Sequence, residues 1–188
     1  MSILTTPRLR LEPYTDAHLE GLHLINSNEE VMRYITGKPV SYEETKAHIE
    51  LTKELWRING YASWCFIEKM TNQIIGTGGI QHLEFNQENP LEIGWRILPS
   101  KWHQGFATEA AQCMMKYAFD ARGLEILYSV CHPDNIGSEK IMRRLDMTFR
   151  GIEKWYDLDT KAYQITKEQY QKNQPKHDAT LKMTAVSN

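Results

Sequence analysis

The residues from Trp102 to Ala107, Trp-His-Gln-Gly-Phe-Ala, could form a loop that binds a phosphorylated ligand, although most single glycines before a helix mark an ordinary turn. An apolar segment precedes them and a helical pattern follows, so their backbone N–H groups would lie at a helix N-terminus, where anions bind. Gly105 has no Cβ and Ala107 is small, which lets a bulky phosphate approach the backbone. The turn suits a pyrophosphate. It is not a Walker A loop, because no Gly-Lys-Ser/Thr follows.

Length and composition limit what kind of protein can carry such a loop. A chain of 188 residues with 41% apolar and 24% charged residues is typical of one soluble globular domain. The net charge of −2 offers no basic surface for nucleic acid. The sequence has no apolar run long enough to cross a membrane and no signal-peptide pattern. We therefore expect a cytoplasmic protein.

The cysteines of the chain are Cys65, Cys113 and Cys131, an odd number spread far apart. A disulfide framework needs an even set, and a zinc site needs close Cys or His pairs. We expect free thiols in a reducing compartment and no metal.

The elements that must position the loop follow from the hydrophobic period and from the helix caps. Alternating or apolar segments predict strands at residues 8–13, 61–68, 74–85, 91–98, 126–130, 149–158 and 162–166. Helical spacing predicts helices near residues 16–25, 29–34, 42–59, 105–122 and 135–145. Ser41 and Glu44 form a capping box, and Gly60 should end the helix that it starts. The turn of the last hairpin is expected at residues 159–161.

The order of these elements predicts a mixed α/β (α+β) domain with helices on both faces of one sheet. The strands do not alternate regularly with helices, which disfavours a Rossmann domain. We expect the domain to cover residues 1–171 and a flexible polar tail to cover residues 172–188.

In its context the loop resembles the coenzyme A pyrophosphate loop of GNAT acetyltransferases, Arg/Gln-x-x-Gly-x-Gly/Ala. Other segments resemble, in the same order, the branch that acetylates the N-termini of ribosomal proteins: Thr6-Pro7-Arg8-Leu9-Arg10-Leu11, Ile75-Gly76-Thr77-Gly78-Gly79-Ile80, Glu92-Ile93-Gly94-Trp95 and Asn135-Ile136-Gly137-Ser138. The resemblance covers roughly residues 5–166. It implies the GNAT fold, a mostly antiparallel sheet of six to seven strands whose fourth and fifth strands splay apart, and it implies acetyl-CoA as co-substrate.

The resemblance also implies which residues bind acetyl-CoA. Backbone groups of Arg96, Ile97 and Leu98 would pair with the pantetheine arm, and the Ile97 N–H would polarise the thioester carbonyl as in an oxyanion hole. Asn135 would bond the pantetheine, and Ser138 would lie near the sulfur, where it could protonate the leaving thiolate. The pyrophosphate would lie on His103, Gln104, Gly105, Phe106, Ala107 and Thr108.

Two positions depart from the family pattern: Leu145-Asp146-Met147 stands where Leu-Gly-Phe is usual, and the general acid differs. Many relatives carry a tyrosine as general acid seven residues after the asparagine, and this chain has Met142 there. The general acid must then be Ser138 or a water molecule, or the reaction proceeds without one. A thiol with a pKa of about 8.5 can leave without much help.

The attacking amine must lose a proton to a base. Glu92, beside the cofactor strand, could serve through a water molecule, and a surface or salt-bridged carboxylate is the equal alternative. A protein α-amine, with a pKa of about 7.7–8.0, needs less help than a lysine near 10.4. Arg33, Tyr34 and Trp155 could line the acceptor site, although surface and packing roles fit them equally.

We therefore expect an N-acetyltransferase that moves an acetyl group from acetyl-CoA to a primary amine by direct attack, foremost to a protein N-terminus. Glu92, Ile97 and Ser138 would be its catalytic residues, and it would act as a monomer or homodimer without nucleic acid or membrane. The alternatives are a small-molecule acceptor (an antibiotic, amino acid or polyamine), a non-catalytic acyl-CoA-binding module, and a nucleotide-binding protein using the same helix N-terminus.

Overall fold

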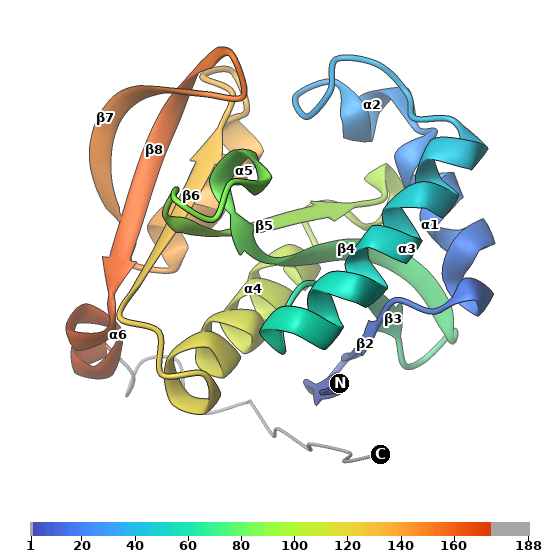
Figure 1. The fold of residues 1–188 in the computed structure, drawn as a ribbon, viewed down its shortest axis with the longest axis horizontal. Coiled ribbons are helices and arrows are strands. Elements are labelled where there is room, and N and C mark those ends of the chain that lie inside the picture. Colours follow the sequence, from blue (N-terminus) through green and yellow to red (C-terminus); the bar gives the residue numbers. More distant parts are fainter. Residues whose placement is uncertain (1, 174–188) are drawn as a thin grey trace.

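An eight-stranded sheet organises the protein in the computed structural model, which describes residues 2–173 (Figure 1). The strands are β1 (Leu4–Thr5), β2 (Leu9–Pro13), β3 (Ser63–Glu68), β4 (Gln73–His82), β5 (Leu91–Ile97), β6 (Ile126–Cys131), β7 (Thr148–Trp155) and β8 (Leu158–Thr166). Their spatial order is β1-β2-β3-β4-β5-β6-β8-β7, and only β5 and β6 are parallel. The predicted mixed, mostly antiparallel sheet is confirmed. It has one strand more than expected, the two-residue β1.

Helices cover both faces of this sheet. They are α1 (Leu19–Asn26), α2 (Glu29–Met32), α3 (Tyr42–Asn59), α4 (Phe106–Lys116), α5 (Ile136–Arg144) and α6 (Lys167–Asn173). Shorter helical turns are η1 (Asp16–His18), η2 (Leu83–Phe85) and η3 (Pro99–Lys101), and the π-helical η4 (Tyr117–Ala121) prolongs α4. In the described part of the chain, none of the helices is both long enough and apolar enough to cross a bilayer.

The alternation of side chains along β3 shows how the two layers of helices are attached. Cys65 and Ile67 pack in a cluster with residues of α1 and α3. Their neighbours Trp64 and Phe66 point to the opposite face and join the main core with α4. Because successive side chains of a strand face opposite sides, one strand that is buried on both faces joins α1 and α3 to one side and α4 to the other.

The predicted caps of α3 are confirmed. The Ser41 side chain accepts a hydrogen bond from the Glu44 N–H, and the Glu44 carboxylate accepts one from the Ser41 N–H at 2.8 Å. Gly60 ends the helix in the left-handed conformation with φ +72°. The conformation costs glycine little because it has no Cβ.

Two local expectations at the C-terminal end were wrong. The last hairpin turns at Tyr156 and Asp157, not at residues 159–161, and β8 already begins at Leu158. The polar residues 159–161 lie in β8 because β7 pairs with them across the hairpin. The sequence analysis did not predict α6, which includes the first two residues of the expected tail. Residues 174–188 of that tail lie outside the described part.

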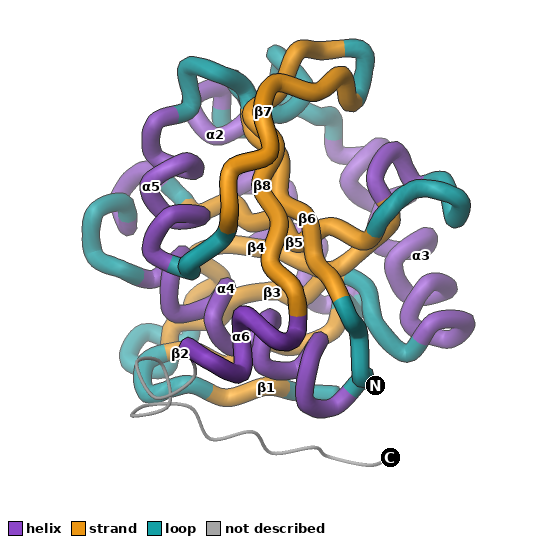
Figure 2. The backbone as a smooth tube through the Cα atoms, turned by 90° about the vertical axis from the view of Figure 1, so that its left-hand side faces the viewer, coloured by secondary structure: helices purple, strands orange, loops and turns teal. Residues whose placement is uncertain are grey.

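The sheet divides between β5 and β6. β4 and β5 pair along their length, from Gly76 with Ile97 to His82 with Leu91, whereas β5 and β6 share one register pair, Glu92 with Tyr128. β6 instead pairs with β8 along its whole length, and β6, β8 and β7 run beside one another (Figure 2). The two strands thus part after Glu92, at their C-terminal ends. We call the space between them the β5–β6 gap.

β4 and β5 lie so close together at Gly78 that a larger side chain has no space there. A Cβ at this position would lie 2.4 Å from the Gly94 carbonyl oxygen and 2.7 Å from the Phe66 ring. We expect Gly78→Ala to destabilise the protein by about 1–3 kcal/mol, because the backbone must shift to relieve the overlap. Denaturant unfolding measures this. Gly94→Ala, on the neighbouring strand, meets nothing within 4 Å and should unfold like the wild type; equal losses in both variants would contradict the explanation.

Candidate active site

The backbone of β5 presents unpaired groups to the β5–β6 gap. The Leu98 N–H donates to the Ile75 carbonyl at 2.9 Å. Because antiparallel pairing alternates along a strand, the backbone groups of Arg96 and Leu98 face β4, and those of Trp95 and Ile97 face the gap. No residue of β6 pairs with either of the latter two. The structure thus brings the predicted Ile97 donor to the gap, and it does not bring the Arg96 and Leu98 backbone groups there.

The predicted phosphate loop folds back onto the end of β5. The Trp102 indole donates to the Ile97 carbonyl at 2.7 Å, and the Gln104 side chain donates to the Ser100 carbonyl at 3.0 Å. His103 and Gly105 both have positive φ, +59° and +82°. His103 and Gln104 are exposed. The Trp102 bond uses the Ile97 oxygen and leaves the Ile97 N–H available.

The N-terminus of α4 differs from those of α2, α3 and α5. These three helices begin with a side-chain cap, from Asn28, Ser41 and Asn135. α4 begins at Gly105, which has no side chain to cap it, and its first internal bond runs from the Glu109 N–H to the Gly105 carbonyl. The N–H groups of its first turn, from Phe106 to Thr108, therefore have no partner within the helix and can bind an anion. This arrangement fits a pyrophosphate.

Arg8, at the start of β2, holds the loop and α4 together. Its Nε lies 2.6 Å from Glu109 Oε2, and its backbone N–H donates to Glu109 Oε1 at 2.9 Å. Its Nη1 donates to the Gln104 carbonyl at 2.9 Å, and the guanidinium carbon lies 4.3 Å from the centre of the Phe106 ring. Both segments contain motifs that the sequence shows, but the sequence does not predict this contact. It joins residues 101 positions apart, for which the sequence contains no local signal.

Glu92 lies at the point where β5 and β6 part, and its side chain is only 8% exposed. Gln81 Nε2 donates to Glu92 Oε1 at 3.2 Å, and the Tyr156 hydroxyl donates to the same oxygen. Burial raises the pKa of Glu92, and these two hydrogen bonds lower it again in part. No cation among the described residues forms an ion pair with Glu92. It is thus neither a surface carboxylate nor a salt-bridged one.

The aromatic residue that reaches this carboxylate is Tyr156, whereas the sequence analysis selected its neighbour Trp155 as a substrate residue. The Trp155 indole donates to Glu153 at 3.0 Å, within its own strand. Tyr156 follows β7 in a two-residue turn and points to Glu92 of β5. A hairpin turn with two positive φ values commonly carries Asn-Gly or Asp-Gly, so Tyr156-Asp157 gave no recognisable signal.

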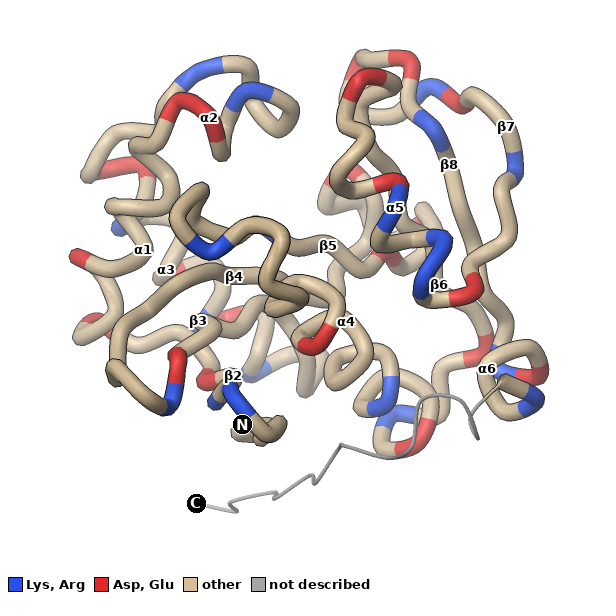
Figure 3. Tube along the Cα trace, turned by 180° about the vertical axis from the view of Figure 1, so that it is seen from behind, with Lys and Arg blue, Asp and Glu red and all other residues tan. Residues whose placement is uncertain are grey.

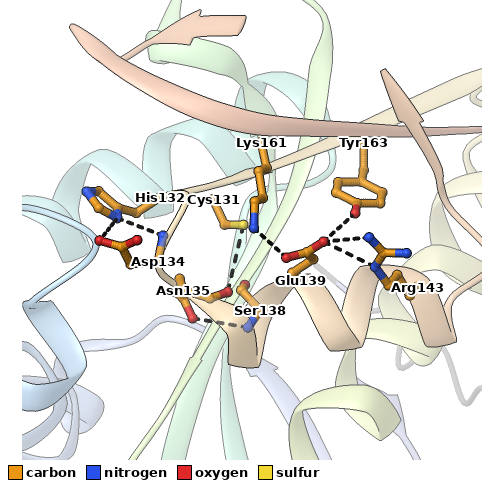
Figure 4. Close-up of polar contacts among 9 residues, drawn as sticks. All are labelled: Cys131, His132, Asp134, Asn135, Ser138, Glu139, Arg143, Lys161 and Tyr163. Carbon is orange, nitrogen blue, oxygen red and sulfur yellow. Dashed lines mark hydrogen bonds and ion pairs between the residues drawn. The ribbon is translucent and has the colours of Figure 1, made fainter. Parts of the chain in front are cut away.

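On the other side of the gap, the first turn of α5 carries Asn135 and Ser138 (Figure 4). The Asn135 Oδ1 accepts the Ser138 N–H at 3.1 Å. This cap leaves the Asn135 amide group as a donor. The Ser138 hydroxyl makes no hydrogen bond with the described residues, so it too can bind a ligand.

Glu139 anchors α5 to β8 (Figure 4). Its carboxylate lies 2.6 Å from Lys161 Nζ and 2.7 Å from Arg143 Nη2, and accepts the Tyr163 hydroxyl at 2.9 Å. These three donors hold the pKa of Glu139 at about 2. The network fixes the orientation of the turn that carries Ser138.

Comparisons with known proteins identify the family. The model of the acetyltransferase (GNAT) domain matches residues 8–148. The chain is also 30% identical over 172 residues to the uncharacterized N-acetyltransferase YoaA of Bacillus subtilis, covering 88% of this chain and 97% of that protein.

The chain belongs to the GNAT acetyltransferase family. It is an acetyl-CoA-dependent N-acetyltransferase. A solved GNAT-family acetyltransferase from Bacillus anthracis is similar to it with a TM-score of 0.74 and 25% identity, over 88% of this chain and 99% of that one. RimL, described as a ribosomal L7/L12 alpha-N-protein acetyltransferase in complex with coenzyme A, is similar in fold with a TM-score of 0.70 and 20% identity, over 85% and 94% of the two chains. The likeness to RimL is one of fold.

Tyr34 spans the two sides of the gap in this acetyltransferase. Its ring stacks on His132, with centroids 5.2 Å apart and planes at 29°. Tyr34 follows α2 and His132 follows β6, and α2 and α5 stand on opposite sides of β5 (Figure 3). Arg33 is exposed, with its guanidinium carbon 6.0 Å from the Tyr34 ring centre. Of the two predicted residues, Tyr34 is thus placed at the gap.

The side chains of Met142 and of the three cysteines are buried and have no catalytic setting. Met142, at the position of the family's tyrosine acid, is fully buried in the main core. Cys65, Cys113 and Cys131 are buried free thiols. Burial raises the pKa of Cys131 to about 11 and that of Cys113 to about 12. Among the described residues, no group of three or more His, Cys, Asp or Glu side chains could hold a metal ion.

The contacts of Arg8 predict a specific effect on acetyl-CoA binding. Arg8→Met removes the guanidinium from Glu109 and Gln104, so the loop loses its support. We expect the KM for acetyl-CoA to rise about tenfold, with a smaller change in kcat, as for one charged hydrogen bond. Steady-state kinetics with varied acetyl-CoA measure both constants.

Arg10→Met is the matched control for this variant. Arg10 lies on the same strand and pairs with Glu12 at 2.8 Å and with Asn72 at 2.8 Å, away from the loop. Its KM for acetyl-CoA should equal that of the wild type. A wild-type KM in Arg8→Met, or an equal rise in both variants, would show that Arg8 does not support the loop.

Proposed function

We propose that this acetyltransferase acetylates the primary amine at the N-terminus of a protein or peptide, by direct attack of the amine on acetyl-CoA. The observation that carries the proposal is the buried Glu92, which has no paired cation among the described residues and lies where β5 and β6 part. A carboxylate in this position can draw a cationic amine into the gap and accept its proton.

Different residues around the gap would bind different parts of acetyl-CoA. The first turn of α4, including Ala107 and Thr108, would bind the pyrophosphate, with His103 and Gln104 at its edge. The Asn135 amide would donate to the pantetheine arm. The Ile97 N–H would donate to the thioester oxygen, where negative charge develops during attack. One such donor contributes roughly 3–4 kcal/mol in a well-placed site.

The acceptor would enter on the face of β5 that carries Glu92. Gly94 lies on this face two residues further, and a Cβ there would meet nothing within 4 Å. The open space lies between Glu92 and Arg96, because every second residue of a strand shares a face. Tyr34 and Tyr156 would form the walls of this acceptor site, and Arg33 would lie at its edge.

Two side chains, Glu92 and Ser138, would transfer the protons of the reaction. An ammonium loses two protons in becoming an amide. Glu92 would take one through a water molecule and pass it to solvent. The Ser138 hydroxyl would give a proton to the leaving sulfur and regain the second one from the nitrogen, so the products are the amide, the free thiol of coenzyme A and one released proton.

The chemistry of the base favours an α-amine over a lysine side chain. The burial that raises the pKa of Glu92 brings it closer to that of an α-amine, about 7.7–8.0, and proton transfer is most effective when the two are close. RimL, similar in fold, is described as an alpha-N-protein acetyltransferase. The buried free thiols suit a reducing compartment such as the cytoplasm.

A panel of acceptors tests the proposal. Each peptide is offered with a free N-terminus and, as its control, with a blocked N-terminus and one internal lysine; a polyamine, an amino acid and an aminoglycoside complete the panel. We expect release of coenzyme A with free N-termini, and mass spectrometry should place the acetyl group there. If only the small amines are acetylated, the acceptor is a small molecule and the proposal of a protein N-terminus is wrong. Failure with every amine would favour the non-catalytic acyl-CoA-binding module.

The role of Glu92 predicts the effect of one substitution. Glu92→Gln keeps the shape of the side chain and one acceptor oxygen for Tyr156 and Gln81, and it removes the base. We expect kcat to fall about 10²–10⁴-fold, the range for loss of a general base, with unchanged stabilisation of the protein by acetyl-CoA. Glu88→Gln, at an exposed position of the preceding loop, is the control and should retain full activity. Full activity in Glu92→Gln would exclude Glu92 as the base.

A further inference from the structure

The turn between β7 and β8 holds an unfavourable conformation next to Glu92. Tyr156 and Asp157 have φ values of +55° and +59°, a region of backbone conformation that is unfavourable for L-residues. The Tyr156 N–H donates to Glu84 Oε1 at 2.8 Å, and Glu84 itself has φ +56°. Two strained turns, from the hairpin and from η2, therefore hold each other in place beside the carboxylate.

The turn directs one hydroxyl at one oxygen of Glu92. The Tyr156 hydroxyl and Gln81 Nε2 both donate to Glu92 Oε1, and Gln81 Nε2 is 3.5 Å from the Tyr156 hydroxyl. Glu92 Oε2 makes no hydrogen bond with the described residues. The two donors thus fix the plane of the carboxylate and leave its second oxygen available for a water molecule or an amine.

We propose that Tyr156 is a positioning residue for Glu92, which orients its carboxylate and keeps it ionised so that it can accept a proton. This inference rests on the proposed role of Glu92 as the base. A buried carboxylate without donors favours its neutral form, which cannot accept a proton. A hydroxyl that donates to the carboxylate stabilises the charged form, and it compensates in part for the burial.

The other charged and titratable groups around Glu92 do not stabilise its ionised form by a hydrogen bond. Glu84 of η2 accepts the Tyr156 N–H and adds a further negative charge. Tyr128 of β6 is the register partner of Glu92, and its ring lies 5.1 Å from the guanidinium carbon of Arg150. Arg96 lies on the same face of β5, but its Nη1 points to Met32 at 3.5 Å. None of these groups donates a hydrogen bond to Glu92.

The pH dependence of Tyr156→Phe tests the proposal, because this variant removes one oxygen atom and keeps the ring. Activity requires the ionised carboxylate, so it is lost as the pH falls through the pKa of Glu92. Without the donor this pKa rises, and the acidic limb of kcat/KM should move to higher pH by about one unit, a tenfold change in the ionisation constant. Acetyl-CoA should stabilise the variant as it does the wild type.

Three further variants complete the experiment. Tyr42→Phe removes another tyrosine–glutamate bond, from Tyr42 to Glu20 at 2.7 Å on the far helices α3 and α1, and its pH profile should match the wild type. Glu84→Ala frees the Tyr156 N–H and keeps the hydroxyl. Glu84→Ala also removes the negative charge of Glu84, which acts on Glu92 in the opposite direction, so it is compared with Glu84→Gln, which removes the same charge and keeps an acceptor oxygen. Relative to Glu84→Gln, the acidic limb of Glu84→Ala should lie at higher pH, and this comparison provides the test if Tyr156→Phe does not fold.

The outcomes separate this inference from the proposed function. An acidic limb that stays in place in Tyr156→Phe, whether or not activity falls, would overturn the positioning role. If Glu92→Gln is inactive at the same time, Glu92 remains the base and only the role of Tyr156 is lost. If Glu92→Gln is fully active, Glu92 is not the base, and the inference about Tyr156 is wrong as well.

Discussion

The site depends on the separation of β5 and β6 after their one register pair, Glu92 with Tyr128. Each strand is held on its outer side, β5 by β4 and β6 by β8, so the two half-sheets keep their shape without pairing to each other. The separation leaves backbone N–H groups of β5 unpaired, which costs free energy unless a ligand satisfies them. A substrate with its own carbonyl and amide groups, such as the pantetheine arm of acetyl-CoA, can take the place of the missing strand.

The two sides of the gap are fixed by separate polar networks. On one side, Arg8 ties Glu109 and the Gln104 carbonyl together, so that the uncapped start of α4 faces outward. On the other side, Glu139 ties the first turn of α5 to Lys161 and Tyr163 of β8. Both carboxylates lie one turn into a helix whose N-terminus is proposed to bind the substrate. Both carboxylates are held by hydrogen bonds to other protein groups, so these networks would act on catalysis through position alone.

The sequence predicts well those features that depend on neighbouring residues. The capping box at Ser41 follows from a few adjacent residues, and the succession of strands and helices along the chain follows from the period of the hydrophobic pattern. The role expected of the loop at Gly105 rests on its resemblance to a family motif. The partnership of Arg8 with Glu109 and that of Tyr156 with Glu92 could not be predicted, because each joins distant segments. The hairpin turn was misplaced for a related reason: tertiary contacts hold Tyr156 in a conformation that its residue type does not favour.

The central claim is that acetyl-CoA binds in the β5–β6 gap with its pyrophosphate on the first turn of α4, and thermal unfolding with and without acetyl-CoA tests it most directly. At a hundredfold excess over the dissociation constant, binding should add about 2.7 kcal/mol of apparent stability. Gly105→Glu, which places a negative charge at this turn, should unfold without that gain. A wild-type protein that acetyl-CoA does not stabilise, or a Gly105→Glu variant that it stabilises equally, would contradict the account.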